Sequence, residues 1–164
     1  MKPFVLVKQI AIVTAIALII IMLASCGGGS TANPSTVTGN WTITLYNTSN
    51  VASYVITTSL NQQVASPSVS SPVTGSNLAL TADPSANGCF AADSSAKQTG
   101  VFTVNDNFQG MTINTLQLTI QGSTGTITLR GPFATTGISG PWQLQTTVPN
   151  CTLSSSGTFM MTRA

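Results

Sequence analysis

Few side chains in this sequence can do acid, base or nucleophilic chemistry. It holds three aspartates, Asp83, Asp93 and Asp106, and neither glutamate nor histidine. Without histidine, a Ser-His-Asp or Cys-His arrangement cannot form. A paired-carboxylate hydrolase would need two of the aspartates to converge. Asp83 precedes Pro84 and Asp106 stands between two asparagines, a setting typical of turns. We therefore expect no enzymatic activity and no catalytic residue.

The three cysteines remain, and the first of them, Cys26, ends an apolar leader. Lys2 and Lys8 supply a basic start, residues 9–25 carry no charge, and residues 10–23 are almost wholly apolar. This is the layout of a secretory signal peptide. Residues 23–26 read Leu-Ala-Ser-Cys, which resembles the lipobox of bacterial lipoproteins. The resemblance implies that residues 1–25 are a signal peptide, removed when Cys26 receives its acyl chains.

A lipobox also implies a location. Several acyl chains make a durable membrane anchor where a single chain would not. Gly27, rather than aspartate, follows the lipidated cysteine, and this favours the outer membrane of the cell envelope. Residues 26–38 comprise the lipidated Cys26 and a Gly-, Ser- and Thr-rich stretch, which we expect to be a flexible linker. The alternative is an uncleaved transmembrane helix, for which about 17 residues is the lower length limit.

Cys89 and Cys151 are left in the exported part of the chain. Two cysteines in an exported domain most simply form one disulfide bond. A metal site and a reactive thiol are the competing interpretations. Both lack the histidine and glutamate that would complete a ligand set. We expect the disulfide, no metal site and no cofactor.

Residues 39–164 are long enough for one domain with a modest core. Its charged residues balance, with three cations against three anions: Lys97, Arg130 and Arg163 against Asp83, Asp93 and Asp106. Nucleic acid is not an expected partner, because nothing here could neutralise a row of phosphates.

Apolar residues alternate with Thr, Ser and Gln along most of this domain, which predicts half-buried antiparallel strands. We expect a single all-β domain of about eight short strands. The clearest alternations carry these apolar residues: Trp41, Ile43 and Leu45; Leu116, Leu118 and Ile120; Ile127 and Leu129; Phe159 and Met161. A turn is expected at residues 105–107 and a β-bulge near residues 114–115, where the apolar parity changes. The Gly-Pro pairs at residues 131–132 and 140–141 suggest strand ends or an edge.

A closed barrel would remove the free edges of such a sheet. Residues 39–41 read Gly-Asn-Trp, the pattern that opens lipocalin-like and avidin-like up-and-down barrels. The resemblance implies that Trp41 plugs one end of the barrel. Arg163 shares the parity of Phe159, so its cation could stack on the Trp41 indole. An immunoglobulin-like sandwich is the alternative fold, although the cysteines do not bracket a tryptophan as that fold expects.

Two functions fit these features. The first is a membrane-anchored cell-envelope lipoprotein with a non-enzymatic binding or structural role, whose partner is a protein or a glycan. The second is a lipocalin-like carrier of a small apolar ligand. A carrier should hold an apolar internal cavity that solvent can reach. A binding module should have a filled interior and exposed apolar groups instead.

Overall fold

The computed structural model describes residues 36–64, 68–86, 88–134, 136–151 and 155–164. The predicted signal peptide, Cys26 and most of the linker lie outside the described residues. Within the described ranges the chain contains strands, turns and loops. These ranges contain no helix of the length and apolar character needed to cross a membrane.

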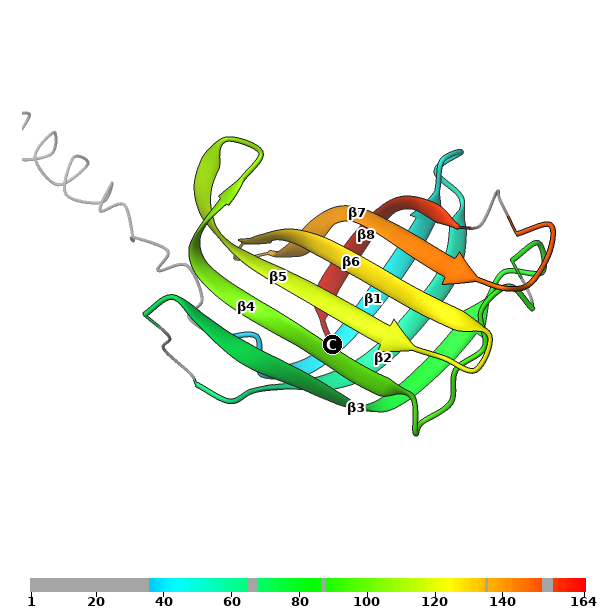
Figure 1. Ribbon diagram of the computed structural model, residues 1–164, viewed down its shortest axis with the longest axis horizontal. Coiled ribbons are helices and arrows are strands. Elements are labelled where there is room, and N and C mark those ends of the chain that lie inside the picture. Colours follow the sequence, from blue (N-terminus) through cyan, green and yellow to red (C-terminus); the bar gives the residue numbers. More distant parts are fainter. Residues whose placement is uncertain (1–35, 65–67, 87, 135, 152–154) are drawn as a thin grey trace, which may run out of the picture. The chain divides into compact units, whose positions relative to one another are not determined.

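Eight antiparallel strands form a closed up-and-down barrel, as predicted (Figure 1). Each strand pairs with the next along the chain, and β8 closes the barrel by pairing with β1. This closure overturns the sandwich alternative. The strands are β1 (Gly39–Asn47), β2 (Ala52–Gln62), β3 (Ser70–Ala82), β4 (Lys97–Phe108), β5 (Met111–Gln121), β6 (Gly125–Ala134), β7 (Gly137–Thr146) and β8 (Ser156–Arg163).

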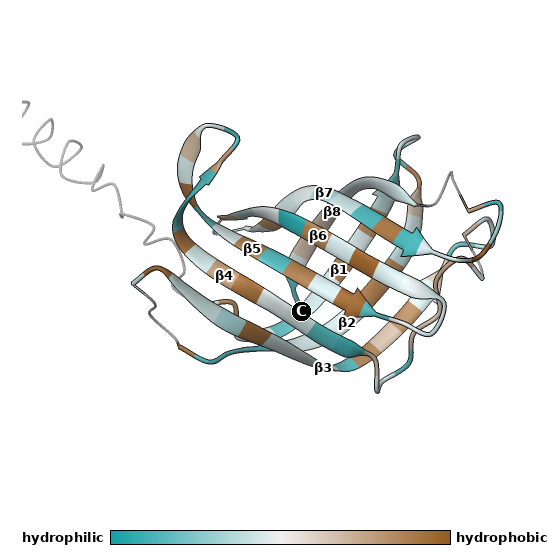
Figure 2. Cartoon of the chain, viewed as in Figure 1, coloured by the Kyte–Doolittle hydropathy of each residue, from teal (hydrophilic) through white to brown (hydrophobic). Residues whose placement is uncertain are grey.

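The two-residue alternation places one face of each strand inside the barrel. On β1, Trp41, Ile43 and Leu45 are buried, whereas Thr42 and Thr44 are partly exposed. Brown and pale segments alternate along the strands in Figure 2 for the same reason. Successive side chains of a strand point to opposite faces, so this pattern fixes the register of pairing.

The turn expected at residues 105–107 is wrong, because β4 continues through it. The chain reverses instead at Gln109 and Gly110, whose φ angles of 52° and 81° suit a two-residue hairpin. The bulge expected near residues 114–115 is present at that position of the β4–β5 ladder, but the extra residue is on β4. The β4–β5 register shifts between Thr103 and Asp106, opposite Asn114.

The Gly-Pro pairs do not mark strand ends or an edge, contrary to expectation. Pro132 lies within β6 and Pro141 within β7. Pairing of these strands lapses between Leu129–Trp142 and Phe133–Ile138. Both prolines therefore lie in a gap of the β6–β7 ladder, while Pro132 stays in register with Thr115 on β5 and Pro141 with Thr158 on β8.

Candidate functional site

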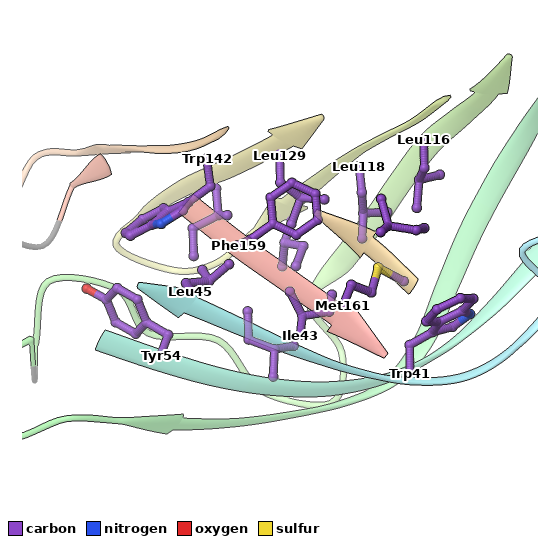
Figure 3. Packing of buried hydrophobic residues seen from close by; sticks show 14 of the residues in the cluster. Trp41, Ile43, Leu45, Tyr54, Leu116, Leu118, Leu129, Trp142, Phe159 and Met161 are labelled. Carbon is purple, nitrogen blue, oxygen red and sulfur yellow. The ribbon is translucent and has the colours of Figure 1, made fainter. Parts of the chain in front are cut away.

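The two ends of the barrel are the candidate functional regions. At one end, here called the Trp41 end, β1 begins and β8 finishes. At the opposite end, here called the strap end, β3 leads into β4 through a long connection. Figure 3 shows Trp41 at one end of the row of core side chains and Tyr54 with Trp142 at the other. Either end could serve as a ligand entrance, so what closes each one decides what the barrel can do.

Trp41 closes its end with its indole, which is 1% exposed. Its Nε1 donates a hydrogen bond to the Val37 carbonyl at 2.8 Å. Arg163 is the direct neighbour of Trp41 on β8, and its guanidinium carbon lies 4.7 Å from the centroid of the indole. This is within the range of a cation–π contact, so the stacking predicted for these two residues is present.

The chain entering β1 is fastened across this same end. Arg163 donates hydrogen bonds from Nη1 to the Thr38 carbonyl at 2.9 Å and from Nη2 to the Thr36 carbonyl at 2.8 Å. The Val37 amide donates to Oε1 of the buried Gln62 at 2.9 Å. Val37 itself is fully buried. The last residues of the expected linker therefore lie against the barrel as part of its plug.

Replacing Arg163 with alanine is expected to lower the free energy of unfolding by about 2 kcal/mol, because it removes a cation–π contact and two charge-assisted hydrogen bonds. Arg163→Lys should lose less, since a lysine keeps the charge but not the two-pronged geometry. Urea denaturation of both variants measures the difference. Equal midpoints for wild type and Arg163→Ala would show that the guanidinium is merely solvated.

A disulfide bond between Cys89 and Cys151 pins the strap end. The S–S distance is 2.07 Å and the Cα atoms are 5.6 Å apart, as predicted from the cysteine count. Cys89 belongs to the β3–β4 connection, and Cys151 belongs to the β7–β8 connection. These two connections lie on opposite sides of an eight-stranded barrel. The disulfide therefore holds the β3–β4 connection across the opening.

Residues 88–96, here called the strap, are also bonded to the β5–β6 connection. The Ala91 amide donates to Thr124 Oγ1 at 2.9 Å, and the Ala91 carbonyl accepts from the Ser123 amide at 2.8 Å. Gly122 lies so close to the strap that a Cβ atom there would overlap Phe90 and the Ala91 carbonyl. The strap therefore runs from β4 past the β5–β6 connection towards the β7–β8 connection and covers this end of the barrel.

Three aromatic rings fill the strap end: Phe90 of the strap and, beneath it, Tyr54 and Trp142. Tyr54 makes edge-to-face contacts with Phe90 and Trp142, at centroid distances of 6.1 and 5.9 Å. The Trp142 Nε1 donates to the Tyr46 carbonyl at 2.8 Å, and the Tyr54 hydroxyl donates to the Ala86 carbonyl at 3.3 Å. All three rings are at most 2% exposed. Buried aromatic side chains therefore close this end as well.

Burial raises the pKa of the Tyr54 phenol from 10 to about 12, because the phenolate is poorly solvated under the strap. Between these values the unfolded chain loses the proton and the folded chain keeps it. Stability is therefore full below pH 10 and is lost as the pH rises through 12, by about 2–3 kcal/mol in all.

Urea midpoints measured from pH 9 to 12 test this prediction, and Tyr54→Phe should flatten the decline. The matched control is Tyr46→Phe, which should leave the decline in place. A decline that persists in Tyr54→Phe would assign it to another group.

Side chains fill the space between the two ends. The largest buried ones, each less than about 2% exposed, include Trp41, Trp142, Tyr54, Phe90, Phe102, Phe133 and Phe159. Hollows of about 480, 430 and 400 Å³ lie instead along the outside of the strap end, beside the strap and the β5–β6 and β7–β8 connections. The inward side chains of the described strands therefore leave little accessible surface inside the barrel.

A few polar groups are buried in this apolar interior. Thr58 Oγ1 donates to Gln98 Oε1 at 2.6 Å, and Gln98 is 2% exposed. Gln98 packs against Gly75, where any side chain would overlap it. Gln98 Nε2 has no protein partner among the described residues. These groups are neutral and do not titrate, so they offer hydrogen bonding but no acid or base.

Two of the three carboxylates stabilise their own turns, as predicted for Asp83. Asp83 accepts hydrogen bonds from the hydroxyl and amide of Ser85, and Asp93 accepts the same pair from Ser95. These bonds, the side-chain hydroxyl first, hold the pKa of each carboxyl below its usual range. Both aspartates lie in the β3–β4 connection at the strap end.

Asp106 is not a turn former, contrary to expectation, because it lies within β4. Its Oδ2 accepts hydrogen bonds from Thr115 Oγ1 and Arg130 Nη2, each at 2.6 Å. These two partners, Thr115 first, lower the pKa of its carboxyl. Arg130 also lies over the Phe108 ring, 5.4 Å from its centroid. Asp106 is engaged in an ion pair on the barrel wall, away from the other two carboxylates.

Sequence reasoning missed the residues that close the strap end. Phe90 carried the usable signal, because it is the lone aromatic in the polar stretch beside Cys89. The alternation of Tyr54 and Ile56 with their neighbours indicates a strand and no more. Its contact with the strap depends on barrel closure, which a single strand does not reveal.

The described ranges contain no cluster of three or more cysteine or acidic side chains arranged to hold a metal ion. No protein-family model matches the chain, and neither a curated protein nor a solved structure matches it. The site must therefore be interpreted from its own geometry.

Proposed function

We propose that this chain is a lipid-anchored cell-envelope protein, held at the outer membrane, with a non-enzymatic binding or structural role. The observation that carries the proposal is the closed, self-filled barrel. Trp41 with Arg163 closes one end, and the strap closes the other. A barrel built in this way presents only its outer wall and its end loops to other molecules.

The distribution of titratable groups supports a role without catalysis. Asp83 and Asp93 are occupied by their own turns, and Asp106 by Thr115 and Arg130. General acid–base catalysis needs such groups free and near the substrate. The outward positions are rich in Thr, Ser and Gln, which suits hydrogen bonding to a protein or glycan partner.

Lipid attachment rests on the leader and Cys26. Metabolic labelling with radioactive palmitate tests it in the full chain. Label should enter the wild type and be lost in Cys26→Ser, which should also leave the membrane fraction. The matched control is Cys89→Ser with Cys151→Ser, which keeps Cys26 and should keep the label. Label retained in Cys26→Ser would overturn the anchor.

The carrier of a small apolar ligand is the second candidate. Its support is the barrel architecture, which suits ligand enclosure in general. The aromatic packing under the strap, with Phe90 2% exposed, favours the binding or structural role over the carrier.

A further inference from the structure

The Trp41 end carries exposed apolar side chains in its loops. Val64 and Val69, both within the β2–β3 connection, are 49% and 66% exposed. Met111, which starts β5 directly after the hairpin turn, is 56% exposed. The strands β2, β3, β4 and β5 begin or finish at this end, so all three side chains lie at the same end of the barrel (Figure 1).

The β2–β3 connection is bonded to β4, the strand that leads into the β4–β5 hairpin. The Val104 amide on β4 donates to the Val69 carbonyl at 2.7 Å. β4 continues from Val104 to Phe108, which pairs with Met111 across the hairpin. Single exposed apolar residues are normal on a protein surface, whereas several at one end of a domain favour an interaction there.

The charges of the domain are divided unequally between the two ends. The strap end carries Asp83, Asp93 and Lys97, a net charge of −1 from two acids and one base. The remaining charged residues are Arg163 at the Trp41 end and the Arg130–Asp106 ion pair, a net charge of +1. At the Trp41 end, the exposed Arg163 guanidinium is thus the group that could contact an anion, whereas the strap end carries the excess of acid.

The chain also enters the barrel at this end. Thr36 is fixed beside Arg163, and ten residues separate it from Cys26 (36 − 26 = 10). A stretch of that length spans at most about 36 Å. Thr36 lies at the Trp41 end, so a linker from Cys26 joins the domain at this end. It can bring the Trp41 end to a membrane without running along the barrel wall.

We propose that the Trp41 end docks on the lipid bilayer, with Val64, Val69 and Met111 entering its interface and Arg163 facing the headgroups. The proposal rests on the lipid anchor proposed above. Docking would orient the domain with the strap end away from the membrane. The anchored protein would then have a fixed orientation and would present the strap end to partners.

Depth-dependent fluorescence quenching tests this orientation. The full lipidated chain is placed in vesicles of phosphatidylcholine and phosphatidylglycerol whose acyl chains carry bromine. Single variants Val64→Trp, Val69→Trp and Met111→Trp report the Trp41 end. Matched controls are Val51→Trp at the strap end and Met160→Trp on the wall, at positions that are 50% and 53% exposed. The native Trp41 and Trp142 give a common background, which the wild type measures.

Docking predicts quenching several-fold stronger at positions 64, 69 and 111 than at positions 51 and 160. Urea midpoints equal to wild type show that each variant is folded. Equal quenching at all five positions, while the protein still floats with the vesicles, overturns docking and leaves the anchor intact. A chain that does not float with the vesicles overturns the anchor and docking together. Stronger quenching at position 51 reverses the proposed orientation.

Discussion

Loss of the Cys89–Cys151 disulfide is expected to lower the free energy of unfolding by about 4 kcal/mol, because the bond closes a long loop in the unfolded chain. The cysteines are 62 residues apart in sequence. The double variant Cys89→Ser with Cys151→Ser should therefore unfold at a much lower urea concentration than the wild type. The bond also holds the strap, so Trp142 should become more accessible to the soluble quencher acrylamide.

Treatment with dithiothreitol supplies the control for this experiment. The reductant should lower the wild-type midpoint to that of the double variant and should leave the variant unchanged. The chain has no other cysteine among residues 36–164, so a further effect of the reductant is not expected. Equal midpoints in oxidised and reduced wild type would contradict a stabilising strap.

Trp41→Ala is expected to lower the free energy of unfolding by about 3–5 kcal/mol, as is usual for a large buried side chain. The change removes a fully buried indole and its hydrogen bond to Val37. It also removes the tilted contact with Phe133, at a centroid distance of 6.1 Å, and the surface on which Arg163 stacks. Urea denaturation followed by circular dichroism measures the loss without depending on tryptophan fluorescence.

Two further variants serve as comparisons for the stability loss of Trp41→Ala. Trp41→Phe keeps a ring at the barrel end but leaves the Val37 carbonyl without its donor, so it should lose less than Trp41→Ala. Val101→Ala shortens a side chain that is 44% exposed on the barrel wall and should change stability by less than about 0.5 kcal/mol. Equal losses for Trp41→Ala and Val101→Ala would contradict the plug.

The strands could be predicted because their apolar residues alternate almost without interruption. Trp41, Ile43 and Leu45 show the pattern on β1, and Phe159 and Met161 repeat it on β8. A strand with one buried face has only one acceptable register. The approximate number of strands follows from the repeated pattern. Closure was favoured by the need to cover sheet edges and by the resemblance of residues 39–41 to up-and-down barrels, with the sandwich as the alternative.

Features that depend on two strands at once could not be predicted in the same way. Asp106 between two asparagines has the composition of a turn, yet its partner Arg130 lies on β6, 24 residues away. The gap shared by Pro132 and Pro141 is similar, because it lies between two strands and neither strand shows it alone. Such pairings become visible only when the register is known.

The candidate site was predictable at one end only. Trp41 and Arg163 are direct neighbours on the first and last strands. The apolar alternation of each strand already indicates that both side chains are on its inward face. The strap end depends on the path of residues 88–96, which have no periodic pattern. The disulfide was foreseen, but a cysteine count does not say that Cys89 and Cys151 lie on opposite sides of the opening.

Mass spectrometry of the intact protein, purified from membranes and measured under native and denaturing conditions, tests the closed and self-filled barrel most directly. We expect the same mass in both states once detergent is removed, because the lumen holds no ligand. The denatured mass should be that of residues 26–164 with their acyl chains. A native mass larger by a stoichiometric apolar molecule would contradict the filled lumen and establish a carrier. An unmodified chain that still begins at Met1 would contradict the anchor.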